Sequence, residues 1–206
     1  MTRKCSVFIA TSLDGFIAKE DGSVDWLLEL HASAAPNEDF GYKSFIETVD
    51  ALVMGRKSFE QALTAPQWYY GETPVVVLSR TLTLPRNAPK TVTISSSTPE
   101  QVVADLASQG KQHLYIDGGE VIQSFLGADL IDELTITVIP ILLRAGIRLF
   151  GPRIRETHLL HKHTESFPSG FVQSKYAIDR RAPLLALPSS EQRKWTLPVQ
   201  SAATLR

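Results

Sequence analysis

Residues 49–60 read Val-Asp-Ala-Leu-Val-Met-Gly-Arg-Lys-Ser-Phe-Glu, and this stretch carries the clearest indication of the fold. The short apolar run 51–54, with Asp50 before it and Gly55 after it, predicts a buried strand. The basic residues and the serine that follow predict a helix that begins at once. Because the first N–H groups of a helix have no internal partner and lie at the positive end of its dipole, this layout is typical of an anion site. For this stretch alone, an ordinary strand-to-helix connection with solvated basic side chains is the alternative.

The composition is that of a globular protein without a strong overall charge. With 206 residues, 43% of them hydrophobic, the chain is long enough for one domain with a buried core. The net charge of −1 excludes a global basic field that would attract nucleic acid, and no apolar run reaches the roughly 18 residues that span a membrane. A single cysteine, Cys5, excludes an internal disulfide and favours a reducing compartment. No signal-peptide pattern precedes the first apolar run, so we expect a soluble cytoplasmic protein.

The order of the predicted elements indicates an α/β fold. Strands are expected at 6–10, 16–18, 51–54, 74–78, 91–94, 113–116 and 134–139, helices at 38–48, 56–63, 98–108 and 120–126, and a closing hairpin over 157–178. The early alternation of strands and helices predicts a mostly parallel sheet covered by helices. The late hairpin predicts antiparallel strands at one edge.

Three segments are less regular than the rest. Residues 19–37 show no clear periodicity, and their length is typical of a functional lid, although 24–31 could form a helical turn. Asn37 is the expected N-cap of the helix at 38–48. Beyond residue 181 the chain is rich in proline and leucine, which predicts an extended arm that lies on the protein's own surface or on a neighbour. We therefore divide the chain into a domain at 1–180 and a tail at 181–206.

Three strand ends of the predicted sheet carry residues that suit an anion, at 55–58, 79–80 and 118–120. Ligands of open α/β sheets bind at the carboxyl ends of the strands, so these ends could hold one extended, phosphate-rich ligand. The paired Gly118 and Gly119 allow a pyrophosphate to approach the backbone closely. The sequence has neither G-x-G-x-x-G nor G-x-x-x-x-G-K-[ST]. A nucleotide must therefore be held differently from the Rossmann and P-loop folds.

Three histidines, His158, His161 and His163, resemble a metal cluster in their spacing. On a strand, however, His161 and His163 share a face while His158 points to the other. No cysteine lies nearby, and the neighbouring carboxylates are only Glu156 and Glu165. We therefore expect no metal site.

Four motifs together resemble those of the dihydrofolate reductase superfamily. They occur in the family's order at 10–18 (Ala-Thr-Ser-Leu-Asp-Gly-Phe-Ile-Ala), 53–60 (Val-Met-Gly-Arg-Lys-Ser-Phe-Glu), 116–119 (Ile-Asp-Gly-Gly) and 140–150 (Pro-Ile-Leu-Leu-Arg-Ala-Gly-Ile-Arg-Leu-Phe). The pattern is similar to that of the branch containing the reductase domain of riboflavin-biosynthesis proteins, the RibD C-terminal domain, and its stand-alone relatives. This resemblance covers roughly residues 4–179. It implies a dihydrofolate reductase-like mixed, mostly parallel sheet flanked by helices, with a C-terminal antiparallel hairpin.

The resemblance also implies that NADPH binds along the carboxyl edge of the sheet. The matching residues form the phosphate-binding helix start, a second element around the ribose 2′-phosphate, the pyrophosphate turn and the nicotinamide pocket. In that order they are Gly55, Arg56, Lys57 and Ser58; Ser79 and Arg80; Gly118, Gly119, Glu120 and Val121; and Ala10 and Ile17. Arg56 matches the position that contacts the 2′-phosphate, which favours NADPH over NADH. Residues 19–37 correspond to the loop that closes over the nicotinamide.

Two carboxylates are candidates for the catalytic acid. In dihydrofolate reductases an acidic residue on the helix before the Gly-Arg motif contacts the pterin, and counting back from Gly55 places Asp39 there. A carboxyl in a dry pocket would have a raised pKa and could relay a proton while hydride arrives on the opposite atom. Alternatively, Asp39 only favours the first turn of its helix through the helix dipole. Asp14 is the second candidate, although the Asp14-Gly15 pair is typical of a turn.

The leading hypothesis is an NADPH-dependent reductase that transfers hydride to a C=N or C=O group of a small heterocyclic substrate. One alternative is the 5-amino-6-(5-phosphoribosylamino)uracil reductase of riboflavin biosynthesis, where Arg144 or Arg148 could serve the substrate phosphate. Another is a non-catalytic nucleotide-binding or scaffold protein with the same fold. Arg144 stands where the family motif usually has glycine, and the deaminase zinc motif of the bifunctional riboflavin proteins is absent. We expect a homodimer, as the resemblance implies.

Overall fold

The computed structural model describes residues 3–34, 38–151 and 156–181. Their helices and strands follow one another along the chain in the order β1 (Lys4–Ser12), β2 (Phe16–Ala18), α1 (Asp25–Ala34), α2 (Tyr42–Ile46), β3 (Ala51–Gly55), α3 (Arg56–Leu63), β4 (Val75–Leu78), β5 (Val92–Ser95), α4 (Pro99–Ser108), β6 (His113–Asp117), α5 (Gly119–Gly127), β7 (Glu133–Ile139), β8 (Ile147–Arg148), β9 (Leu159–Ser166) and β10 (Val172–Ile178). None of the described helices is long and apolar enough to cross a membrane.

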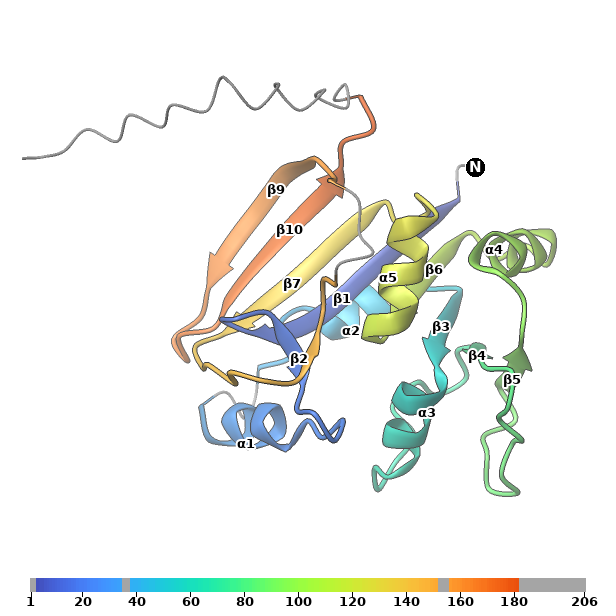
Figure 1. The fold of residues 1–206 in the computed structure, drawn as a ribbon, viewed down its shortest axis with the longest axis horizontal. Helices are drawn as coiled ribbons and strands as arrows, with labels where there is room; N and C mark the ends of the chain where they lie inside the picture. Colours follow the sequence, from blue (N-terminus) through green and yellow to red (C-terminus); the bar gives the residue numbers. More distant parts are fainter. Residues whose placement is uncertain (1–2, 35–37, 152–155, 182–206) are drawn as a thin grey trace, which may run out of the picture.

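Eight of the described strands form one sheet in the order β5-β4-β3-β6-β1-β7-β10-β9 (Figure 1). The pairs from β5 to β7 are parallel, whereas β10 pairs antiparallel with both β7 and β9. The sequence-based prediction of a mostly parallel sheet with an antiparallel hairpin at one edge is therefore confirmed. The predicted tail lies outside the described residues except for Arg181.

The structure differs from the sequence-based prediction in three places. Within the segment 19–37, α1 is a ten-residue helix and extends beyond the helical turn that 24–31 could form. The helix predicted over 38–48 is reduced to α2, because Phe40 and Gly41 have φ angles of +53° and +78° and cannot belong to a right-handed helix. Its predicted cap, Asn37, lies outside the described residues. The two-residue strand β8 was not predicted, and it pairs antiparallel with β2. By contrast, α4 begins as expected: Thr98 caps it, and the Thr98 hydroxyl accepts a hydrogen bond from the N–H of Gln101.

Helices cover both faces of the parallel part of the sheet. On one face, Ile122 and Phe125 of α5 pack with Val7 and Val53. On the other, Phe59 of α3 packs in a cluster with Met54, Tyr115 and the aromatic residues of α2. Successive residues of β3 therefore point to opposite layers, as the pleat of a strand requires. In Figure 1, α5 lies across β1 and β6, and α2 lies behind the sheet.

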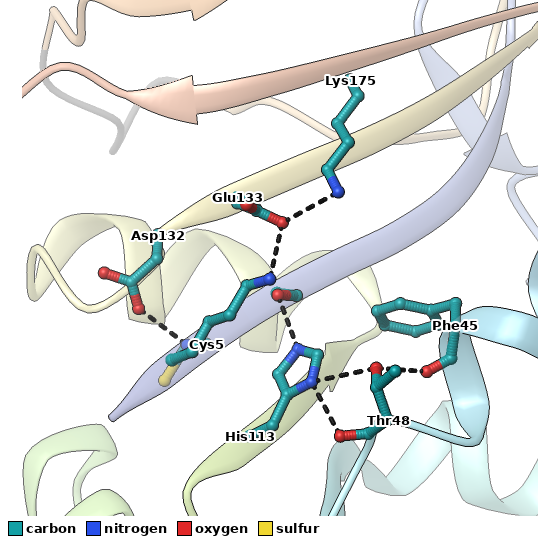
Figure 2. Close-up of polar contacts among 9 residues, drawn as sticks. Cys5, Phe45, Thr48, His113, Asp132, Glu133 and Lys175 are labelled. Atoms are coloured by element: carbon teal, nitrogen blue, oxygen red, sulfur yellow. Dashed lines mark hydrogen bonds and ion pairs between the residues drawn. The ribbon is translucent and has the colours of Figure 1, made fainter. Parts of the chain in front are cut away.

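Hydrogen bonds and ion pairs between polar side chains link the strands at the amino end of the parallel sheet. The imidazole of His113 on β6, labelled in Figure 2, lies 2.8 Å from the hydroxyl of Ser6 on β1. The carboxylate of Glu133 on β7 forms ion pairs with Lys4 at 2.8 Å and with Lys175 on β10 at 3.3 Å. This end of the sheet is thus held by polar contacts. The opposite, carboxyl end carries the residues that were predicted to bind a ligand.

Candidate functional site

The predicted anion-binding strand ends lie side by side at the carboxyl edge. Gly55 at the end of β3 pairs with Leu78 of β4, the residue before Ser79. Met54 pairs with Asp117 of β6, the residue before Gly118. The three predicted ends therefore occupy neighbouring strands, in the order β4, β3 and β6. One ligand laid across this edge would reach all three.

The starts of α3 and α5 face each other closely at the centre of this edge. Gly118 has a φ of +84°, and a Cβ atom on it would overlap the hydroxyl of Ser58. The same Cβ would lie 3.9 Å from the backbone nitrogen of Gly55. A Cβ on Gly119 would lie only 2.9 Å from Cδ1 of Ile17. Gly118 favours glycine because of its positive φ, whereas a Cβ on Gly119 would require the end of the Ile17 side chain to move. We call the bare backbone of Gly55, Gly118 and Gly119, together with Ser58, the cradle between the two helix starts.

Neither helix start carries a side-chain cap. Gly55 and Gly118 are the N-caps of α3 and α5, and glycine has no side chain that could accept a hydrogen bond from the first N–H groups of these helices. Arg56 and Lys57 are exposed next to this point, and Arg56 forms a 3.9 Å ion pair with Glu60. Two uncapped helix starts and two cations suit a doubly charged pyrophosphate. The residues present therefore fit a dinucleotide.

The remaining residues predicted to bind the cofactor differ in their positions and in their exposure to solvent. Ser79 lies at the end of β4, where its hydroxyl accepts hydrogen bonds from the N–H groups of Thr81 and Leu82, and Arg80 is exposed. Glu120 is exposed at the start of α5, whereas Val121 is buried and would lie 3.3 Å from a Cβ on Gly55.

The two residues predicted to line the nicotinamide pocket lie in different clusters. Ala10 packs with Trp26 and Ile139, whereas Ile17 packs beside Gly119. The structure therefore brings Ile17, but not Ala10, into direct proximity of the cradle.

The expectation of a dry, proton-holding Asp39 is wrong. Its side chain is exposed, and its carboxylate accepts hydrogen bonds from the N–H of Gly41 at 2.9 Å and of Lys43 at 3.0 Å. The N–H groups of Lys43 and Gly41 lower the pKa of Asp39 below its usual value. Asp39 thus stabilises the start of α2, which was the alternative interpretation.

Asp14 lies in the turn after β1, as its pairing with glycine indicated. Its carboxylate accepts a 2.6 Å hydrogen bond from the Ser12 hydroxyl and bonds from the N–H groups of Leu143 and Arg144. The Ser12 hydroxyl is the main cause of a lowered pKa at Asp14. These contacts fix the turn and the loop after β7, and they oppose a role as proton donor.

Sequence analysis missed Asp117 as a candidate acid. It is half-buried at the end of β6, on the same side of the sheet as Tyr115, and burial raises the pKa of its carboxyl to about 6. Burial, together with the charge of Asp117, raises the pKa of the nearby Tyr42 to about 12 and also raises that of Tyr70. The available signal was a carboxylate directly before Gly118-Gly119, at the end of a buried apolar strand.

The histidines of the closing hairpin make separate contacts. His161 lies 2.7 Å from the hydroxyl of Thr164, and His163 lies 4.0 Å from the carboxylate of Glu165. In the described ranges, no three His, Cys, Asp or Glu side chains lie close enough together to hold a metal ion.

Comparison with known proteins places this geometry in a family. The model of the RibD C-terminal domain matches residues 3–173. The chain belongs to the RibD C-terminal domain family. As a RibD C-terminal domain, it is similar to the uncharacterized Bacillus subtilis protein YwjB, with 37% identity over 81% of this chain and 94% of YwjB. A second uncharacterized protein of that organism, YyaP, is 28% identical over 84% of this chain and 94% of its own length.

Solved structures also resemble this RibD C-terminal domain. A Shewanella sp. PV-4 protein whose name refers to riboflavin biosynthesis is 40% identical, with a TM-score of 0.79 over 86% of this chain and 99% of that one. Acinetobacter baumannii RibD is 17% identical, with a TM-score of 0.65 over 86% of this chain and 58% of its own. At that identity the second similarity shows the fold alone, a dihydrofolate reductase-like sheet with flanking helices.

Proposed function

We propose that this protein is an NADPH-dependent reductase of a small heterocyclic substrate. The observation that carries the proposal is the cradle formed by Gly55, Ser58, Gly118 and Gly119 at the carboxyl edge of the sheet. Two uncapped helix starts meet there, beside the cations Arg56 and Lys57. The membership of the RibD C-terminal domain family, which includes reductases of riboflavin biosynthesis, supports a nicotinamide cofactor at this edge.

The residues of the chain have distinct tasks in this proposal. NADPH, when bound, supplies a hydride. The N–H groups at the starts of α3 and α5 bind its pyrophosphate, and Arg56 binds the 2′-phosphate. Ile17, which packs beside Gly119, excludes water from the reacting end. Asp117, whose pKa is raised to about 6 by burial, is the proton donor to the C=N group in this proposal.

The pyrimidine reductase of riboflavin biosynthesis is the second candidate. It is favoured by the family match and by the similar fold of the Thermotoga maritima deaminase and 5-amino-6-(5-phosphoribosylamino)uracil reductase, which is 13% identical. Reduction of that pyrimidine by the protein with NADPH would favour this second candidate function. Binding of NADPH without reduction of this pyrimidine or of other heterocycles with a C=N or C=O group would favour the non-catalytic nucleotide-binding function.

The decisive experiment is a titration with NADPH and with NADH in which tryptophan fluorescence reports binding. We expect NADPH to bind more tightly than NADH. The Arg56→Ala variant is expected to lose roughly tenfold to hundredfold in NADPH affinity, the range of a charge-assisted hydrogen bond, and to keep its NADH affinity. Arg3→Ala is the matched control, because Arg3 is exposed at the amino end of β1. If neither nucleotide binds the unmodified protein, the proposed function is wrong.

We also propose that the protein is a homodimer, which is compatible with its free sheet edge. Among the described strands, β9 is the last in the sheet, and both of its leucines, Leu159 and Leu160, are more than a third exposed. A strand with an unpaired edge readily pairs with a second copy. Sedimentation velocity is expected to give a dimer for the unmodified chain and a monomer for Leu160→Lys. A monomer at all concentrations would contradict this proposal.

A further inference from the structure

One face of the antiparallel part of the sheet contains a hollow that the reductase site does not use. The register pairs Ile136 of β7 with Ser174 of β10, and Val138 with Val172, so these side chains share a face. A cavity of about 220 Å³ lies on this face. It is lined by β1, the turn after it, β7, β10 and the segment after β8, with Thr11, Ser12, Leu13, Gly15, Ile136, Val138, Leu149, Phe150, Ser174 and Tyr176. We call this region the open face.

No described helix covers the open face. In Figure 1, α5 crosses β1 and β6, whereas no helix of the described ranges crosses β10 or β9. Apolar side chains around the hollow are consequently exposed: Leu13 by 66%, Phe150 by 45% and Val172 by 37%. Exposed apolar side chains around a hollow are typical of a docking site rather than of a solvated face.

The chain leaves the sheet next to this face and at a fixed point. Arg180 donates hydrogen bonds to the Asp132 carboxylate at 2.7 Å and to the Ile131 carbonyl at 2.8 Å. Both acceptors lie in the loop after α5, so the exit is on the side of the sheet that α5 covers. The Asp179 carboxylate then accepts a 3.0 Å bond from the N–H of Arg181. Such an Asx turn changes the direction of the chain at the end of β10.

The residues that follow have the composition and the reach to cover the hollow. Residues 182–188 read Ala-Pro-Leu-Leu-Ala-Leu-Pro, without a charge. At about 3.3 Å per extended residue, 184–187 can lie roughly 10–20 Å from Arg181. Tyr176 and Ser174 lie five and seven residues back along β10, which is about 17–23 Å at the same rise. The leucines and the hollow are thus at matching distances from the exit.

We propose that residues 183–188 of this chain fold back onto its own open face and fill the hollow with leucine side chains. Prolines at 183 and 188 have no N–H group and disfavour pairing with the edge of a sheet. Packing on a face requires side chains instead, and this segment supplies three leucines. The docked segment would also contact Leu13 and Gly15, in the turn that leads to Ile17, and thereby support the cofactor edge of the sheet.

Disulfide trapping in the full chain tests this proposal. Ser174→Cys on the open face is combined in turn with Leu184→Cys, Leu185→Cys or Leu187→Cys, and the rate of oxidation is followed by mass spectrometry. Lys175→Cys with the same partners is the matched control, because residue 175 points to the opposite face of β10. The native Cys5 does not interfere, since burial raises the pKa of its thiol to about 12.

We expect at least one tail position to form a disulfide with residue 174 inside a monomer at least tenfold faster than with residue 175. Equal rates for the two faces, or no disulfide with either, would overturn the proposal. A disulfide that joins two chains would also overturn it, in favour of a second copy on the open face. As an independent readout, Leu184→Asp with Leu185→Asp should increase hydrogen exchange across β10, and Ser189→Asp with Ser190→Asp should not. Equal exchange in both variants would contradict docking.

Discussion

The carboxylate of Asp14 accepts a 2.8 Å hydrogen bond from the backbone N–H of Arg144, 130 residues further along the chain. A second bond, of 3.2 Å, comes from the N–H of Leu143. Arg144 has a φ of +69°, a conformation that a residue with a Cβ adopts only at a cost. The motif of the family usually has glycine at this position. The turn after β1 therefore holds the loop after β7 in a backbone conformation that its own residue disfavours.

Arg144→Gly is expected to stabilise the protein by about 1 kcal/mol, because glycine adopts positive φ without strain. Urea denaturation at pH 7 measures the change in the free energy of unfolding. Arg148→Gly is the control: Arg148 lies in β8 with its guanidinium 4.4 Å from the centre of the Phe16 ring, and its removal should destabilise. A loss of stability in Arg144→Gly would show that the arginine side chain makes a contact worth more than the strain.

Asp117→Asn is expected to stabilise the protein at pH 8 and to have little effect at pH 4. The folded-state pKa is raised to about 6 from an ordinary 3.8, so the folded protein binds the proton more tightly than the unfolded chain. Above pH 6 the ionised, half-buried carboxylate consequently destabilises the fold, by roughly 1–3 kcal/mol at about 1.4 kcal/mol per pKa unit. Chemical denaturation at the two pH values tests this. A less stable variant at pH 8 would mean that hydrogen bonds to the carboxylate outweigh its burial.

The contrast between Asp117 and Asp39 shows what the sequence could and could not predict. The strands, their order along the chain and the glycines of the cradle followed from apolar runs, turn residues and the four motifs. The environment of a single carboxylate did not, because it depends on side chains that come from distant segments. Phe40 and Gly41 delay the start of the helix to Tyr42 and leave Asp39 exposed before it, whereas Asp117 is half-buried near Tyr42 of α2 and Tyr70. The spacing of residues along the chain could not predict that Asp117 is half-buried and Asp39 exposed.

His113 is expected to make stability fall as the pH drops from 7 towards 5. Burial lowers its pKa, and the ring nitrogens lie 2.9 Å from the Thr48 carbonyl and 2.8 Å from the Ser6 hydroxyl, which suits the neutral ring. Below pH 6.5 the unfolded chain therefore binds a proton that the folded protein does not, and stability decreases. Asp117 has the opposite dependence in this range, so the comparison uses Asp117→Asn with and without His113→Asn. Equal pH dependence of the two variants would exclude His113 as the cause.

Gly118→Ala tests the cradle through its geometry. The new methyl group would overlap the Ser58 hydroxyl and stand at a φ of +84°, so we expect a loss of about 2–4 kcal/mol from overlap and backbone strain together. In a Ser58→Ala background the overlap disappears and the remaining Cβ lies at an ordinary 3.5 Å, which leaves a loss of about 1–2 kcal/mol. Gly127→Ala is the control within α5, where a Cβ meets nothing within 4 Å.

Thermal unfolding with and without NADPH then separates the fold from the function. The double variant Ser58→Ala/Gly118→Ala is expected to fold and yet to lose the NADPH-induced rise in melting temperature, because it removes the Ser58 hydroxyl and adds a methyl group to the backbone that is proposed to bind the pyrophosphate. Gly127→Ala should keep that rise. If the folded double variant still responds to NADPH as the unmodified protein does, the cofactor does not lie between the starts of α3 and α5.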